Sequence, residues 1–412
     1  MNRLVLSAKN MKQDASATFL SVLLIAVSYA LILLVIELQK QTDDYLKNQI
    51  APIDMVIGAK GSPLQLILSS VLHIDKPTGN IPWEEAEKIR KHPLVAKSIP
   101  LAYGDNAQGF RIVGTTHSYA ELYNLNVQEG RLWDAYFEVT VGHEVAKTLN
   151  LSLGDTLISA HGLVGNLEEH DSHPYIVRGI FRPSSSPIDR LLLTDIHSVW
   201  EAHSDHGHDE NEHDHEYDHN HNTGEEHEHN HADEEYTAVL IKFRSLAGLM
   251  QLPRLENEET RMQAAVPNIE MDRLLKLIGN GAFALQIAGI IILFLSAVSL
   301  FIQMYRSFQK RRYEWALMRV YGASSLYAST VLLIEAVCIA LLGIVVGWTI
   351  SRIGQWLLTK LELSPLLREI DIPLFEISDA YLTLAILTIA IWAAFAPIVK
   401  GLRMDLSETL SS

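Results

Sequence analysis

The chain has 412 residues, of which 48% are hydrophobic and only 20% are charged, a balance that argues against an ordinary soluble protein. Its formal net charge is −16, but residues 201–235 hold 14 acidic and no basic residues. The charge is therefore local, it says little about partners, and no nucleic-acid partner is expected. The one cysteine, Cys338, excludes an intrachain disulfide and is most simply a small packing residue.

Four apolar segments are each long enough to cross a hydrocarbon core of about 30 Å. The first follows a basic lead that includes Arg3, Lys9 and Lys12. Because this segment is longer than the h-region of a signal peptide and no clear cleavage site follows it, we expect an uncleaved signal anchor. A gap of 242 residues separates it from the other three. The predicted spans are residues 17–38, 281–305, 326–350 and 380–397.

Basic residues set the expected orientation. They gather in the N-terminal segment 1–16, the loop 306–325 and the tail 398–412, which share one side of a four-span protein. That side is predicted to be cytoplasmic, and residues 39–280 and 351–379 to face outward. We expect an α-helical membrane protein with four transmembrane helices, arranged one plus three, and a large mixed α+β extracytoplasmic domain between the first two. It would lie in the inner (cytoplasmic) membrane with this domain in the periplasm.

Within the outer domain, the patterns predict a mixture of helices and strands. Residues 82–92 predict a helix, with proline at its start and acids in its first turn. Residues 139–149 predict a short strand that runs into a helix, and residues 195–200 predict a helical turn. Alternating residues predict strands at 155–160, 175–181 and 237–244.

A histidine- and acid-rich segment, residues 203–235, interrupts this domain in a loop. Imidazole and carboxylate groups are good ligands for zinc, copper and nickel, with zinc the leading candidate here. Repeated flexible ligands suit a metal sink, sensor or hand-off arm and not a catalytic centre, which needs fixed ligands. A solvated acidic loop is the alternative, and the same two interpretations apply to a looser group, His161, His170 and His173. The ten histidines of the segment are His203, His206, His208, His213, His215, His219, His221, His227, His229 and His231.

Basic and aromatic residues are interleaved in the loop 306–325. Its residues Tyr313, Ala316, Leu317 and Val320 share one helical face, and Gly322 predicts the end of the helix. The pattern alone leaves two interpretations open. One is an interfacial helix with snorkelling lysine and arginine side chains, and the other is a docking helix for a cytoplasmic motor.

The segment KRRYEWALMRVYGAS, residues 310–324, resembles the signature of the FtsX-like permeases of ATP-binding-cassette (ABC) systems. This is the class of macrolide exporters and lipoprotein-release permeases. Residues 141–157, 332–347 and 396–410 resemble further parts of the same permeases, so the resemblance covers nearly the whole chain. The residues that match the signature are Arg311, Glu314, Ala316, Arg319, Val320, Gly322 and Ala323.

The resemblance implies the permease subunit of a mechanotransmission system. A separate cytoplasmic ABC ATPase would hydrolyse ATP and move the loop, the first two membrane helices and the outer domain. The chain contains no G-x-x-x-x-G-K-[ST] phosphate loop, so we expect no nucleotide bound by this chain and no enzyme activity of its own. Members of the family work as dimers, which implies a homodimer. The resemblance assigns ATPase coupling to Arg311, Arg312, Glu314, Arg319 and Gly322.

Three residues of the third span stand out as candidates for helix packing. Gly343 and Gly347 form a GxxxG motif, which permits close helix approach within one bundle or between two copies. Glu335 is ionisable, and we expect it to make an intramembrane or interfacial hydrogen bond instead of lining an ion pathway.

Together these features predict the permease subunit of an ABC-type system linked to zinc or another divalent metal in the periplasm. An extracytoplasmic metal-binding or carrier protein and membrane lipid are further candidate partners. Three alternatives stay open: an exporter or extractor of lipoprotein, peptide or small molecule; a signalling regulator of an extracytoplasmic enzyme; and a metal-buffering protein without a motor. No nucleophile–base pair or compact metal motif suggests catalysis, so no catalytic residue is assigned.

Overall fold

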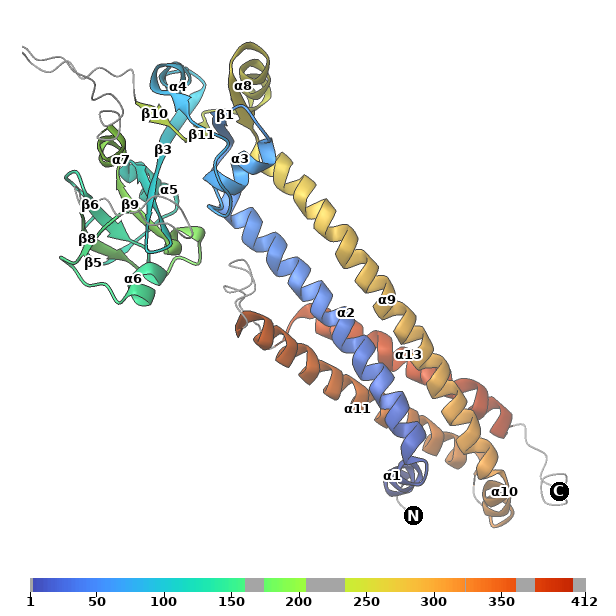
Figure 1. The fold of residues 1–412 in the computed structure, drawn as a ribbon. Coiled ribbons are helices and arrows are strands. Elements are labelled where there is room, and N and C mark those ends of the chain that lie inside the picture. Colours follow the sequence, from blue (N-terminus) through green and yellow to red (C-terminus); the bar gives the residue numbers. More distant parts are fainter. Residues whose placement is uncertain (1–2, 160–173, 205–233, 323, 361–374, 403–412) are drawn as a thin grey trace, which may run out of the picture. The chain divides into compact units, whose positions relative to one another are not determined.

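Long helices and a separate mixed α/β body make up the described parts of the chain (Figure 1). The computed structural model describes residues 3–159, 174–204, 234–322, 324–360 and 375–402. It divides into a membrane unit, Met1–Asp44 with Lys276–Ser412, and an outer domain, Tyr45–Leu275.

Four helices of the described residues are long and apolar enough to cross a bilayer. One precedes the outer domain and three follow it, so the predicted fold class, four membrane helices with a large α/β domain between the first two, is confirmed. Two short helices, α1 (Arg3–Gln13) and α10 (Arg312–Val320), belong to the same unit. The four long helices are α2 (Ala15–Ile50), α9 (Pro267–Lys310), α11 (Ser325–Lys360) and α13 (Ile377–Leu402).

Three of these helices, α2, α9 and α11, are much longer than their predicted apolar spans. Helix α2 continues past the span end at Leu38 to Ile50, and α9 begins at Pro267, well before the span start at Gly281. The extensions contain good helix formers such as lysine, glutamine and leucine, so the backbone hydrogen bonds continue after the apolar run stops. Hydropathy locates the membrane crossing, but it does not locate the helix ends.

Helices α2 and α9 are joined by polar side chains along their length. Gln303 Nε2 donates to Thr18 Oγ1 at 2.8 Å, and Gln286 Nε2 donates to Gln39 Oε1 at 3.2 Å. Between these two levels, Gly289 leaves room for Ile32, which a methyl group at position 289 would approach to 2.6 Å. The two helices therefore form an antiparallel pair that is fixed in register.

The outer domain contains a ten-stranded, mostly antiparallel sheet whose main path has the order β12-β1-β11-β3-β4-β9-β6-β8-β5, with β7 pairing to β8. The pairs β4–β9 and β6–β8 are parallel. A separate two-stranded ladder joins β10 and β2. The strands are β1 (Met55–Ala59), β2 (Ile81–Pro82), β3 (Val95–Ala107), β4 (Phe110–Thr115), β5 (Val127–Gly130), β6 (Glu138–Val141), β7 (Thr156–Leu157), β8 (Tyr175–Phe181), β9 (Leu191–Asp195), β10 (Glu235–Tyr236), β11 (Ala238–Phe243) and β12 (Met262–Ala265).

Strand β3 belongs to both halves of this sheet. Its first part pairs with β11 from Val95 to Leu101, and its second part pairs with β4 from Ala102 to Ala107, with a register shift between Tyr103 and Asn106. Apolar side chains from both halves form one continuous core. Short helices cover the sheet: α3 (Pro63–Ser70), α4 (Trp83–Arg90), α5 (His117–Leu122), α6 (His143–Leu149), the 3-10 turn η1 (Pro187–Arg190), α7 (Ile196–Ser204) and α8 (Leu246–Glu259).

The predicted elements of the outer domain correspond to α4, β6 followed by α6, β8, β11 and α7. The strand predicted at 155–160 is found only as β7, Thr156–Leu157, and residue 160 lies outside the described residues. Strands β1, β4 and β9 carry no alternation that marks them in the sequence, because they are buried on both faces.

His73 is enclosed by a chain of hydrogen bonds between α3, β3 and α5. Tyr103 Oη donates to the carbonyl oxygen of Ser69, so it accepts from His73 Nδ1 at 2.8 Å. The other ring nitrogen, Nε2, then accepts from Tyr119 Oη at 2.8 Å. Both nitrogens of this imidazole are therefore occupied in its neutral form. Burial, helped by the nearby Arg111 guanidinium, lowers the pKa of His73 to about 3.

This enclosure predicts that the outer domain loses stability as pH falls below 6.5. Between pH 6.5 and about 3 the unfolded chain protonates His73 and the folded chain does not, so the unfolded state binds more protons. We expect His73→Gln to remove about 2–3 kcal/mol of the decrease in unfolding free energy between pH 6.5 and 4.5. Urea unfolding of the full-length protein across this range measures the slope.

A matched variant separates the hydrogen bond from the titration. Tyr119→Phe removes one donor but keeps the imidazole, so it should lower the unfolding free energy by about 1–2 kcal/mol at every pH and leave the slope unchanged. Equal slopes for the parent and His73→Gln would show that His73 contributes nothing to the acid response.

Candidate functional site

Helix α10 lies at the turn between α9 and α11, where the sequence predicts a coupling helix (Figure 1). Arg311 is its N-cap residue, and the helix ends at Val320. Gly322 follows with φ +90° and nothing within 4 Å of where a Cβ would lie, so glycine allows the left-handed turn that stops the helix.

One side of α10 is fastened to the bundle. The Trp315 ring packs against the Phe308 ring of α9 with centroids 5.4 Å apart, and Ala316 is fully buried. Tyr313, Ala316, Leu317 and Val320 all lie within α10 at the spacing of one helical face, as predicted, and Ala316 is the member of that face that the bundle covers. The outward face carries Tyr313, Leu317, Val320 and Tyr321, with exposed fractions of 59%, 41%, 59% and 84%.

The predicted coupling residues do not share one environment. Glu314 and Gly322 are exposed, and Arg312 and Arg319 are half-buried. Arg311 is buried, and its guanidinium lies 3.9 Å from Glu335 and 3.4 Å from Ser307 Oγ. An arginine turned into the bundle cannot present its charge on the surface, and its contacts here connect the start of α10 to α9 and α11.

Glu335 of α11 is the centre of a cluster of charged and polar side chains at the start of α10. Its carboxylate accepts from Ser307 Oγ at 3.4 Å and from Asn10 Nδ2 at 3.5 Å, and it faces Arg311. Nearby, Lys310 forms an ion pair with Asp14. The cluster joins α1, α9, α10 and α11, and Glu335 is engaged in hydrogen bonds and an ion pair within one chain.

A second charged cluster lies at the other end of α11. Arg352 Nη2 is 2.8 Å from Glu37 Oε1 of α2 and 2.9 Å from Asp379 Oδ2 of α13, and both carboxylates are fully buried. A surface pair between Lys40 and Glu376, 3.0 Å apart, lies beside it. The sequence analysis did not single out this cluster, although Glu37 and Arg352 are charges at the edges of apolar spans, which is the signal that could have found it.

The GxxxG glycines of α11 pack against α2 of the same chain. A Cβ on Gly347 would lie 2.6 Å from the carbonyl oxygen of Ala26, and one on Gly343 would lie 2.6 Å from Ile25 Cγ2. The sequence left open close helix approach within one bundle or between two copies. The structure contains the close approach within one bundle.

The histidine-rich segment leaves the outer domain after α7 and rejoins it at β10. Trp200 Nε1 donates to the carbonyl oxygen of Glu235 at 2.8 Å, and the Trp200 and Tyr236 rings are 5.6 Å apart. Asn80 Nδ2 donates to the Glu235 carboxylate at 3.0 Å. The exit and return points are thus tethered to each other and to the domain.

The predicted metal ligands themselves lie outside the described residues. This holds for the nine histidines from His206 to His231 and for His161, His170 and His173, while for His203 only its helical backbone in α7 is described. Within the described parts of the chain, no three His, Cys, Asp or Glu side chains gather in a way that could hold a metal ion.

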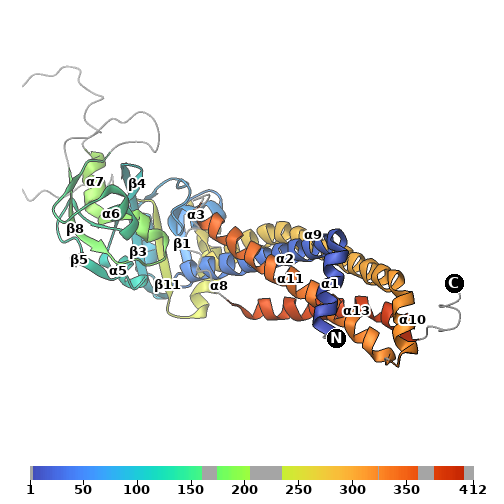
Figure 2. The same ribbon diagram turned by 90° about the horizontal axis from the view of Figure 1, so that it is seen from below.

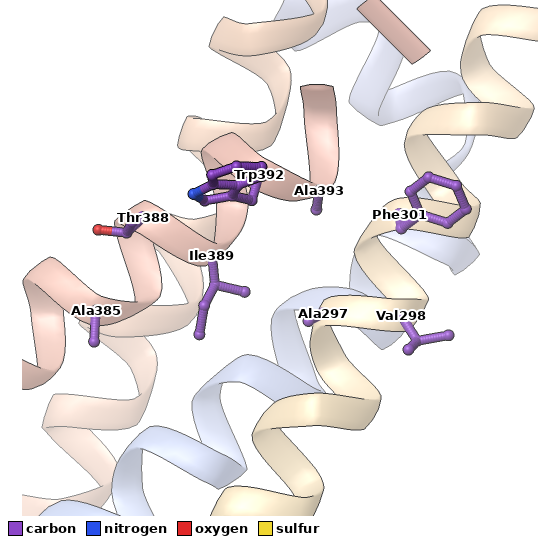
Figure 3. Close-up of a pocket in the computed structure, with 8 residues that line it drawn as sticks. All are labelled: Ala297, Val298, Phe301, Ala385, Thr388, Ile389, Trp392 and Ala393. Carbon is purple, nitrogen blue, oxygen red and sulfur yellow. The ribbon is translucent and has the colours of Figure 1, made fainter. Parts of the chain in front are cut away.

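An apolar groove of about 530 Å³ lies between α9 and α13, and Figure 3 shows the side chains that line it. Its single hydroxyl, on Thr388, donates to the carbonyl oxygen of Leu384 at 2.7 Å, so toward a ligand it could act only as an acceptor. The lining is otherwise almost wholly apolar and carries no charged side chain. Its lining residues are Ala297, Val298, Phe301, Ala385, Thr388, Ile389, Trp392 and Ala393.

Two family models match this chain. Residues 287–406 match the FtsX-like permease C-terminal region, and residues 18–221 match the MacB-like periplasmic core domain. A search of curated proteins finds no match.

Solved structures similar to this chain include the periplasmic region of MacB from Actinobacillus actinomycetemcomitans, with 14% identity over 56% of this chain and 97% of that one and a TM-score of 0.35. The extracellular domain of the ABC-type transporter YknZ from Gram-positive bacteria is similar with 12% identity over 51% of this chain and 98% of that one and a TM-score of 0.31.

The packing of α11 on α2 gives a stability prediction. Gly347→Ala forces a methyl group against the Ala26 backbone, so it should lower the unfolding free energy by about 1–3 kcal/mol. Gly281→Ala in α9 is the control, because nothing lies within 4 Å of its Cβ and alanine favours a helix by about 1 kcal/mol. Unfolding in detergent compares the two. A Gly347→Ala protein that keeps its stability but changes its oligomeric state would assign the glycines to a contact between copies.

Proposed function

Because the chain belongs to the FtsX-like permease family of ABC transporters, we propose that it transmits mechanical force from a cytoplasmic ATPase to a zinc-handling outer domain. The chain is a multi-pass inner-membrane protein and the permease subunit of an ABC-type system. Its ATP hydrolysis belongs to a separate chain in this family. Force transmission, zinc handling and assembly as a homodimer are the parts of this function that we propose.

The observation that carries force transmission is how α10 is attached. Its inward side is held by Trp315 against Phe308 and by Arg311 beside Glu335, so a push on α10 moves α9 and α11 with it. Helix α9 is one continuous helix of 44 residues, about 66 Å long, whose first residues belong to the outer domain. A helix fastened at one end and built into a domain at the other can act as a lever.

The outward side of α10 is suited to receive that push. Four large side chains, Tyr313, Leu317, Val320 and Tyr321, lie on the face that the bundle does not cover. Aromatic anchors are the side chains that carry binding energy at protein interfaces. The arrangement supports the docking interpretation of the loop over the purely interfacial one, with the ATPase bound through this apolar face and Glu314.

Zinc is proposed from the composition of the histidine-rich segment. Ten histidines among 14 acidic residues give many interchangeable ligands of modest individual affinity. The tether at Trp200 and Glu235 supports an arm inserted at one point of the domain, because such an insertion can gather metal without being needed for folding. In this proposal zinc is handled outside the membrane, and nothing passes along the membrane helices.

Docking is tested by adding a charge to the outward face of α10. Leu317→Glu should weaken binding of the ATPase subunit by about a hundredfold, because docking would have to bury a carboxylate in place of an aliphatic side chain. The control, Leu255→Glu on α8, has a nearly equal exposed fraction, 43% against 41%, but lies in the outer domain. Co-purification and ATPase stimulation in nanodiscs are the measurements, and unchanged stimulation by Leu317→Glu would remove docking from this face.

Arg311 should behave differently from the docking residues. Arg311→Ala leaves Glu335 buried beside two weak neutral hydrogen bonds, so it should cost about 3 kcal/mol of stability. Arg311→Ala combined with Glu335→Gln should recover part of that loss. Lost ATPase binding with full stability in Arg311→Ala would instead make Arg311 a surface contact.

The zinc proposal is tested by deleting residues 205–233 in the full-length protein. The deletion should leave the unfolding temperature of the outer domain within a few degrees of the parent, because the tether remains. It should remove more than one zinc ion per chain in calorimetry at neutral pH. In the parent, binding should weaken as pH falls through about 6.5, where imidazoles take up protons.

A variant with the ten histidines replaced by asparagine keeps every acidic residue of the segment and serves as the matched control. Loss of zinc in this variant assigns binding to imidazole. An unchanged zinc count in the deleted protein would exclude the segment as the zinc site and reduce it to a charged linker.

A further inference from the structure

Helix α1 turns two polar residues toward the protein and leaves two aliphatic residues exposed, while Met11 packs partly against the core of the membrane unit. Ser7 and Asn10 are buried, with exposed fractions of 1% and 5%, while Leu4 and Val5 are 59% and 61% exposed. This is the reverse of a water-soluble helix, which buries its apolar stripe. An exposed apolar side is stable only if something other than water covers it.

The inward contacts fix which side of α1 faces out. Ser7 Oγ donates to the carbonyl oxygen of Val331, and Asn10 Nδ2 donates to Glu335, both on α11. The Arg3 guanidinium lies 5.3 Å from the centre of the Tyr327 ring on the same helix. These contacts follow one face of α11, so α1 is held against the bundle and cannot turn its apolar side inward.

Helix α1 also runs across the bundle and does not extend the line of α2. Figure 1 shows α1 end-on beside α2, and Figure 2 shows it crossing α2 and α11. The chain changes direction at Asp14, and α2, a membrane-crossing helix, begins at Ala15. A helix that crosses the direction of the spanning helices lies along the plane of the bilayer.

The outward side of α1 is positively charged. Lys9 and Lys12 are exposed and form no ion pair within the part of the chain that the structure describes, and α1 contains no acidic residue. The adjacent Asp14 is engaged by Lys310. The face therefore combines two aliphatic side chains with two lysines that can extend past them toward an anionic surface.

We propose that this face of α1 is a lipid-binding surface that inserts Leu4 and Val5 into the cytoplasmic leaflet and binds anionic phospholipid headgroups through Lys9 and Lys12. Shallow aliphatic insertion with flanking lysines is what an interfacial helix needs. The positive charge complements the anionic headgroups of the cytoplasmic leaflet, and the face is continuous with the membrane surface entered by α2. The proposal is independent of ATPase docking and of zinc.

Lipid binding would hold Glu335 and Arg311 in place from outside. Asn10 on the inner side of α1 contacts Glu335, which in turn faces Arg311 at the start of α10. Anchoring α1 in the headgroup layer thus braces the cluster that fixes α10.

The test uses the full-length protein with Cys338→Ala and Val5→Cys, labelled with an environment-sensitive fluorophore. It is reconstituted in phosphatidylcholine vesicles that contain either brominated phosphatidylglycerol or brominated phosphatidylcholine as a minor component. We expect blue-shifted emission and stronger quenching by the brominated phosphatidylglycerol. Lys9→Gln with Lys12→Gln should lower the relative association with phosphatidylglycerol about thirtyfold, because each lysine near an anionic surface contributes about a fivefold preference.

Two controls match the change. Lys88→Gln with Lys91→Gln removes the same charges at the same spacing from the end of α4 and its C-cap in the outer domain, and it should leave the quenching unchanged. A label at Met250→Cys, on an exposed apolar side chain of α8, should be quenched by neither lipid. Emission typical of water from the Val5 label would overturn the insertion. Equal quenching by the two lipids in the parent would overturn the headgroup binding.

Discussion

A buried charged side chain needs an oppositely charged or hydrogen-bonding partner, and this requirement determines what both ends of α11 contact. Glu335 meets Arg311 at one end, and Arg352 meets Glu37 and Asp379 at the other. Glu335 and Arg352 are 17 positions apart, about 26 Å along a helix, which is close to the thickness of a hydrocarbon core of about 30 Å. The apolar stretch between them is the part that can lie in lipid. Because each cluster also binds neighbouring helices, the same pairing that makes the charges tolerable sets the positions of α1, α2, α9, α10 and α13.

This arrangement explains why α10 can be both exposed and rigid. A short helix of nine residues is not stable alone in water, so its position must come from contacts with the bundle. Trp315 and Arg311 supply those contacts from one side, which leaves the other side available. Gly343 and Gly347 also contribute to the packing of the bundle, because they let α11 approach α2 closely.

Structural features that depend on the local spacing of residue types could be predicted from the sequence. Features that depend on contacts between residues distant in the sequence could not. Apolar run length located four crossings, and Gly322 marked the end of α10. The inward turn of Arg311 was not predictable, since its partner Glu335 is 24 positions away and a basic residue in a loop is usually solvated. The same holds for Asp379, whose partner Arg352 lies on another helix.

The histidines show why residue type alone does not identify a metal ligand. His73 has both ring nitrogens committed to Tyr103 and Tyr119, and its pKa of about 3 keeps it neutral. A neutral imidazole is the ligand form, yet here no lone pair is left for a metal without breaking a hydrogen bond. Its place in the core makes it a structural group. A metal-binding histidine needs the opposite conditions, with a free ring nitrogen and acidic neighbours that attract cations. In this sequence those conditions are concentrated in residues 203–231, which is why the zinc proposal rests on that segment and on no histidine of the folded core.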